Sequence, residues 1–117
     1  MRILDVDQVS AAEASRLTPH LAEGEEVRAA FTSATGSILF TDRRIVMVVR
    51  EHLLEEKTET TSYPYRELRH FSIVESGESG RAAIRIWLGA EPQPLHLRAE
   101  GGAQLHALQR LLAGMLP

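Results

Sequence analysis

Apolar and polar side chains alternate with a period of two along most of residues 25–99. Successive side chains of a β-strand point to opposite faces of its sheet, so this alternation predicts strands with one buried face. Seven strands are predicted in this way: residues 27–32, 38–40, 45–49, 58–63, 70–74, 83–88 and 95–99. Short turns between consecutive strands favour an antiparallel meander. We therefore expect a mainly β domain, built as a seven-stranded, partly open β-barrel or as two orthogonal sheets.

The predicted strand 58–63 is expected at the edge or the end of a sheet. Pro64 follows it, and proline cannot donate a hydrogen bond to a neighbouring strand. Residues 65–68 predict a turn or a short helical connection. An exposed strand edge is a template on which another chain can pair, so this edge is one candidate interaction surface.

A second periodicity, typical of an amphipathic helix, begins after the last predicted strand. Leu105, Leu108, Leu112 and Met115 recur at intervals of three, four and three residues. Such a stripe must be buried against another element. We expect this C-terminal helix to cap the open mouth between the strands.

The N-terminal region predicts another helix, over residues 7–18. Ser10 and Glu13 have the spacing of a capping box, and the helix should end before Pro19. The expected organisation is therefore an N-terminal helix and turn over residues 1–24, followed by residues 25–117, all within one domain. Counting both helices, the fold could also be described as α+β.

Composition narrows the possible functions of this chain of 117 residues. It has no cysteine, which excludes disulfides, thiolate zinc sites and cysteine nucleophiles. The formal net charge of -3 argues against general nucleic-acid binding, which needs a basic surface. The longest apolar run is far shorter than the ~20 residues of a membrane span. Asp5 comes too early for a signal peptide, so we expect a cytoplasmic protein.

Four segments, in this order, resemble the bacterial pleckstrin-homology-like family. They are Leu-Ala-Glu-Gly-Glu-Glu-Val at 21–27, Ile-Leu-Phe-Thr-Asp-Arg-Arg-Ile at 38–45, Tyr-Pro-Tyr at 63–65 and Phe-Ser-Ile at 71–73. The resemblance spans residues 17–76 by motif and the remainder by layout. It implies a seven-stranded fold with a capping helix, a role in binding or assembly, and a homo-oligomeric state. The loops depart from the family pattern, so the resemblance supports the fold more than a shared partner.

Trp87 is the residue most suggestive of an interface. If Ile84 and Ile86 face the interior, Trp87 faces outward with Arg85, and the next strand directs His96 and Arg98 outward as well. Exposed tryptophan beside arginine is typical of interaction hot spots. Two interpretations stay open at this point, that the N-terminal helix covers Trp87 or that a second subunit does, and a small-ligand site is a less favoured third.

A weaker candidate is an anion site formed by Arg28, Arg43 and Arg44, because guanidinium groups match phosphate and carboxylate. The ordinary interpretation is that Thr41–Arg44 is a tight turn with solvated basic ends. Lipid headgroups are bound in eukaryotic relatives by basic residues around the first strand-to-strand loop, whereas residues 32–37 contain none. Phosphoinositide binding is therefore disfavoured.

Residues for catalysis or metal binding show no converging pattern. The five histidines are not paired at metal-binding spacing: His20, His52, His70, His96 and His106. The acidic run Glu23, Glu25 and Glu26 around a turn is interpreted as solvated surface. The sequence thus predicts no enzyme, no cofactor and no metal site. It favours a module that binds itself or another protein; the alternative is a peripheral adaptor for anionic lipid.

Overall fold

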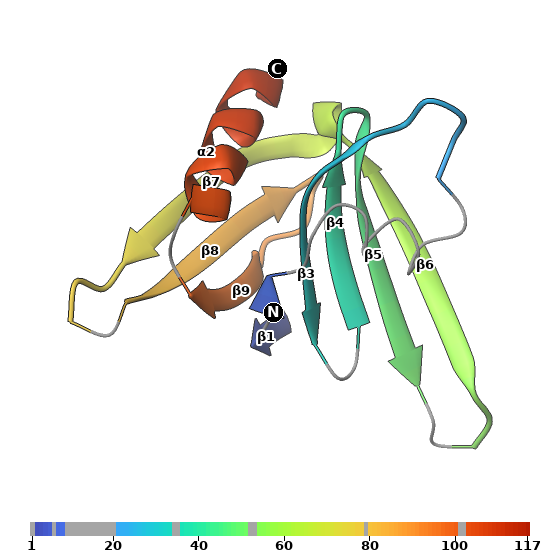
Figure 1. Ribbon diagram of the computed structural model, residues 1–117. Coiled ribbons are helices and arrows are strands. Elements are labelled where there is room, and N and C mark those ends of the chain that lie inside the picture. Colours follow the sequence, from blue (N-terminus) through green and yellow to red (C-terminus); the bar gives the residue numbers. More distant parts are fainter. Residues whose placement is uncertain are drawn as a thin grey trace.

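The computed structural model describes residues 2–5, 7–8, 21–33, 36–51, 54–78, 80–100 and 103–117. Within these residues the fold consists of two β-sheets and one C-terminal helix (Figure 1). The five-stranded sheet has the order β2-β3-β4-β5-β6, with β2 (Asp7–Gln8), β3 (Val27–Ser33), β4 (Gly36–Thr41), β5 (Arg44–Glu51) and β6 (Lys57–Pro64). The four-stranded sheet has the order β1-β9-β8-β7, with β1 (Arg2–Asp5), β9 (Leu95–Glu100), β8 (Arg81–Leu88) and β7 (Leu68–Glu75).

All seven strands predicted from the alternation are present, each within about two residues of its predicted bounds at either end. The short 3-10 helix η1 (Tyr65–Glu67) connects β6 to β7, as the pattern after Pro64 predicted. β6 pairs only with β5 among the described strands, so its predicted edge position is confirmed. Consecutive strands from β3 to β6 and from β7 to β9 are antiparallel.

The description as a β-barrel is wrong. No strand of one described sheet is hydrogen-bonded to a strand of the other, so the two sheets do not close, whereas the prediction of two sheets is confirmed. Figure 1 shows the sheets joined at η1 and diverging away from it. Because the sheets diverge, an open seam is left between them beside β6.

Two N-terminal strands were missed by the sequence analysis. β1 pairs in parallel with β9, with Ile3 opposite His96, and β2 pairs with β3. Asp7 and Gln8 are thus strand residues and not the start of a helix; the rest of the predicted helix, residues 9–18, lies outside the described residues. A strand of four or two residues is too short to show a clear periodicity, and pairing to distant strands decides its conformation.

The main core lies between the sheets and contains the inward residues of both. Phe31 and Phe40 meet edge to face at a centroid distance of 6.2 Å, a favourable aromatic geometry. Helix α2 (Ala103–Met115) packs against β3 and β7 and buries its predicted leucine stripe; Leu105, Leu108 and Leu112 are each 0% exposed. The predicted capping role of this helix is confirmed.

A second apolar cluster lies on the other face of the five-stranded sheet. It consists of Val27, Ala30, Leu39, Val46 and Val48, with Leu21 packed against it. β4 is therefore buried along its whole length. At its first residue, Gly36, a side chain would collide with the backbone carbonyl of Val48, which explains the glycine.

Candidate functional site

The outer face of the four-stranded sheet gathers the four residues proposed as an interface. Along β8, Ala82, Ile84, Ile86 and Leu88 are buried, so the intervening residues face away from the core. Paired residues of neighbouring strands point to the same side of a sheet. Arg85 lies opposite His96, and Arg98 lies opposite Ala83. Trp87, Arg85, His96 and Arg98 therefore share one face, which we call the outer face.

Trp87 on this face stacks on His70 of β7. The ring centroids are 4.2 Å apart with an interplanar angle of 21°, and the two residues are register partners. His70 is exposed and Trp87 is half-buried, so one side of the indole is covered by a neighbour in its own sheet. Sequence reasoning missed this partner because it depends on the alignment of β7 with β8, which contains a bulge between Leu68 and His70.

His96 is half-buried between two arginines of the same face. Burial first, and then the positive charges of Arg85 and Arg98, lower the pKa of the His96 imidazole. Its Nε2 atom is buried and has no hydrogen-bond partner among the described residues. Burial and the two flanking arginines therefore favour the neutral form of His96, while Asp5 of β1 is the register partner of Arg98.

The arginines proposed as an anion site lie elsewhere, around the turn between β4 and β5. Arg44 Nε donates to Glu25 Oε2 at 2.9 Å, and Arg44 Nη2 donates to Glu25 Oε1 at 2.9 Å. Arg43 Nη2 donates to the carbonyl oxygen of Glu23 at 3.3 Å, and Arg28 pairs with Glu26 at 3.3 Å. All three arginines thus contact the acidic segment 23–26.

The interpretation of this acidic run as solvated surface is wrong for Glu25. Its side chain is 0% exposed, and besides Arg44 it accepts hydrogen bonds from Thr41 Oγ1 at 2.6 Å and from the Ala22 amide at 2.9 Å. The hydrogen bonds from Arg44 are the main reason that the pKa of Glu25 falls to about 2, while burial opposes them. A buried, bidentate ion pair of this kind fixes geometry and leaves Arg44 committed to Glu25.

Thr41 connects the separate motif segments. Its hydroxyl accepts from the amides of Arg43 and Arg44, each at 3.0 Å, and its carbonyl accepts from the Tyr65 hydroxyl at 2.6 Å. The segments 21–27, 38–45 and 63–65, which are distant in sequence, meet at this point. We call Glu25, Thr41, Arg44 and Tyr65 the motif junction.

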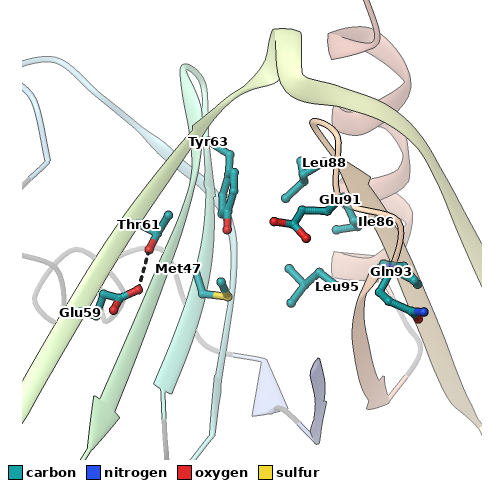
Figure 2. A pocket seen from close by; sticks show the side chains of 10 residues that line it. Met47, Glu59, Thr61, Tyr63, Ile86, Leu88, Glu91, Gln93 and Leu95 are labelled. Carbon is teal, nitrogen blue, oxygen red and sulfur yellow. Dashed lines mark hydrogen bonds between the residues drawn. The ribbon is translucent and has the colours of Figure 1, made fainter. Parts of the chain in front are cut away.

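A separate cavity of about 310 Å³ lies in the seam between the two sheets (Figure 2). Its walls come from β5 and β6 on one side and from β8, β9 and the connecting turn on the other. The lining residues are Met47, Glu59, Thr61, Tyr63, Ile86, Leu88, Glu91, Gln93, Pro94 and Leu95. The cavity exists because the sheets diverge, so it could not be predicted from strand patterns.

Within the described part of the chain, no group of three or more His, Cys, Asp or Glu side chains is placed to hold a metal ion. No helix within the described ranges has the length and apolar character to cross a membrane.

Comparison with known proteins decides the family. The sequence profile of the bacterial PH domain matches residues 2–116. The chain belongs to the bacterial pleckstrin-homology family. The uncharacterized protein YjqA of Bacillus subtilis (strain 168) is 32% identical over 108 residues, covering 91% of this chain and 86% of that protein.

Solved structures show the same fold. A DUF1696 family protein with a pleckstrin-homology domain from Shewanella loihica PV-4 superposes with a TM-score of 0.75 at 20% identity, covering 95% of this chain and 97% of that chain. A pleckstrin-homology domain from Shewanella amazonensis SB2B gives a TM-score of 0.64 at 22% identity, covering 93% and 90%. Membership in this family indicates a binding module.

Proposed function

We propose that this protein is a non-enzymatic assembly module that binds a protein surface, a second copy of itself or another protein, through the outer face. The observation that carries the proposal is the position of Trp87, Arg85, His96 and Arg98 on one side of the four-stranded sheet, with Trp87 held by His70. Tryptophan and arginine are the residues most enriched where binding energy concentrates.

The chemistry of the outer face also restricts the partner. Arg85 and Arg98 are exposed, and they flank His96, whose pKa is lowered first by burial and then by their positive charges. A partner surface that places a carboxylate opposite the Arg85 guanidinium group would gain a charge-assisted hydrogen bond beside an aromatic centre. We expect such a partner to present acidic residues beside an apolar patch.

Light scattering after size exclusion tests self-association, and the decisive variant is Trp87→Ala. Loss of a tryptophan anchor at an interface typically weakens association by about thirtyfold, corresponding to roughly 2 kcal/mol. Leu54→Ala is the matched control, because Leu54 is an apolar side chain, 101% exposed, outside this sheet. If the wild type is monomeric, cross-linking with lysate proteins, compared between wild type and Trp87→Ala, tests binding to another protein.

The proposal fails if Trp87→Ala lowers thermal stability but leaves both the molecular mass and the cross-linked partners unchanged. That result would mean that the indole serves intramolecular packing.

The adaptor for anionic lipid has weaker support. The three arginines that would bind a headgroup interact with the segment 23–26, and Arg44 is held by buried Glu25. Flotation with anionic liposomes tests this alternative. Binding that is lost in Arg43→Ala but not in Trp87→Ala would favour the lipid function over the one proposed here.

A further inference from the structure

The cavity in the seam between the sheets is a second candidate binding site, separate from the outer face. Ile86 and Leu88 line the cavity, whereas Arg85 and Trp87 alternate with them on the opposite side of β8. The cavity and the outer face are therefore on different sides of the four-stranded sheet. A ligand could occupy one without touching the other.

The cavity combines an apolar floor with acidic walls. Met47, Ile86, Leu88 and Leu95 supply the apolar surface, while Glu59 and Glu91 stand on opposite walls. Figure 2 shows the Glu91 carboxylate directed from the β8–β9 turn toward Tyr63 across the cavity. Within the described residues, neither the Glu91 carboxylate nor the Tyr63 hydroxyl has a hydrogen-bond partner. Both are therefore available to a ligand.

A second cavity, of about 370 Å³, continues along β6. It is lined by Val49, Glu51, Lys57, Thr58 and Glu59, so the two cavities share Glu59. The combined lining carries three glutamates, Glu51, Glu59 and Glu91, against the single cation Lys57. We call the two cavities together the β6 groove. Its charge is complementary to a basic ligand.

The shape of the groove favours an extended peptide. β6 has eight residues, and the part before Pro64, from Lys57 to Tyr63, spans roughly 20 Å at ~3.3 Å per residue. β6 is also an edge strand that pairs only with β5 in the described structure, and most of its residues are exposed. Extended peptides bind such edges by main-chain hydrogen bonds, while pockets for alternate side chains provide specificity.

We propose that the β6 groove binds an extended, basic segment of a partner protein by strand addition to β6. An arginine of the segment enters the cavity, its aliphatic part packs on Met47 and Leu95, and its guanidinium group reaches Glu91 and Glu59. The outer face of a second copy cannot supply the added strand, because Arg85 and Arg98 lie on β8 and β9, which have neighbours on both sides.

The test uses a fluorescein-labelled peptide, Thr-Val-Thr-Arg-Thr-Val-Thr, with blocked ends and the whole protein. In a strand, its arginine and both valines face the same side, as the groove requires. Fluorescence anisotropy should show saturable binding that weakens as salt is added. Replacing the peptide's arginine by glutamate should abolish binding. N-methylation of alternate peptide amides should also abolish it, because these amides could no longer pair with β6.

Protein variants locate the site. Glu91→Gln should weaken binding of the arginine peptide about tenfold, as expected for the loss of one charge-assisted hydrogen bond. Glu78→Gln is the matched control, since Glu78 is an exposed glutamate in the β7–β8 turn away from the groove. Trp87→Ala should leave peptide binding unchanged, which separates this site from the outer face. Both glutamates are exposed, so these variants should fold.

Three results would overturn the inference. One is equal affinity of the arginine and glutamate peptides; another is undiminished binding of the N-methylated peptide. The third is a Glu59→Gln, Glu91→Gln double variant that binds the peptide normally or that changes only the oligomeric state. The last outcome would assign the groove to a second copy of the chain.

Discussion

The outer face and the motif junction both contain arginines, but the protein places them in opposite environments. At the motif junction, Arg44 makes a bidentate ion pair with a carboxylate that is 0% exposed. On the outer face, Arg85 is exposed beside a stacked aromatic pair. An arginine whose hydrogen bonds are satisfied inside the fold stabilises structure, whereas an exposed arginine can contribute to binding. The two arginines differ in what their side chains contact within the fold, and not in residue type.

Three of the segments that resemble the family form one structural joint. The segments 21–27, 38–45 and 63–65, which carry the family resemblance, are hydrogen-bonded to one another in the folded protein. The Tyr65 hydroxyl, for example, donates to the carbonyl of Thr41, 24 residues away in the chain. The basic turn is a structural joint between strands, and its charge is not in itself a sign of an anion ligand.

The largest effect is expected at the motif junction. Glu25→Gln should lower the free energy of unfolding by about 3 kcal/mol, because Arg44 would lose its buried counter-charge. Denaturant unfolding measures this change. Glu26→Gln is the control: Glu26 and Arg28 form an exposed pair, and such pairs contribute at most about 1 kcal/mol. Equal effects of the two variants would contradict the assignment of Glu25 as the central carboxylate.

A pH titration of stability tests the same residue without changing its structure. Folding lowers the pKa of Glu25 from 4.5 to about 2, so the unfolded state binds a proton first as the pH falls. The stabilisation is complete above pH 4.5 and is lost as the pH falls toward 2; it corresponds to about 3 kcal/mol. Urea unfolding at a series of pH values should therefore show wild type and Glu25→Gln converging in acid. A constant difference between them would argue against the lowered pKa.

The Tyr65 hydroxyl provides a smaller test of the motif junction. Tyr65→Phe should lower the free energy of unfolding by roughly 1–2 kcal/mol, because the Thr41 carbonyl loses a buried hydrogen bond. Burial of Tyr65 also raises the pKa of its hydroxyl, so the bond persists into strongly alkaline solution. Tyr63→Phe is the matched control and should have little effect on thermal or chemical unfolding.

The smallest effect concerns the electrostatics of the outer face. Arg85→Ala should raise the pKa of His96, because removal of a nearby positive charge favours the protonated imidazole. NMR titration of the imidazole signals measures the direction of this shift. Arg110→Ala, a change of an exposed arginine on α2, should leave it unchanged. An unaltered pKa in Arg85→Ala would show that Arg85 does not act on His96.

The pattern of residues was enough to predict the seven main strands, the buried stripe of α2, the edge position of β6 and the family. These features follow from periodicities within short segments and from the inability of Pro64 to donate a hydrogen bond. They need no knowledge of which strands are neighbours. The outward position of Trp87 also followed, since alternation fixes the two faces of a strand.

The tertiary structure decided the features that depend on pairing between distant segments. The alternation cannot show that His70 stacks on Trp87, that residues 2–5 pair with β9, or that Glu25 is buried against Arg44. Neighbouring glutamates in a turn look alike in sequence, and only one of them meets a buried arginine when the strands assemble. The seam beside β6 belongs to the same class, because the divergence of two sheets is a property of their packing and not of any single strand.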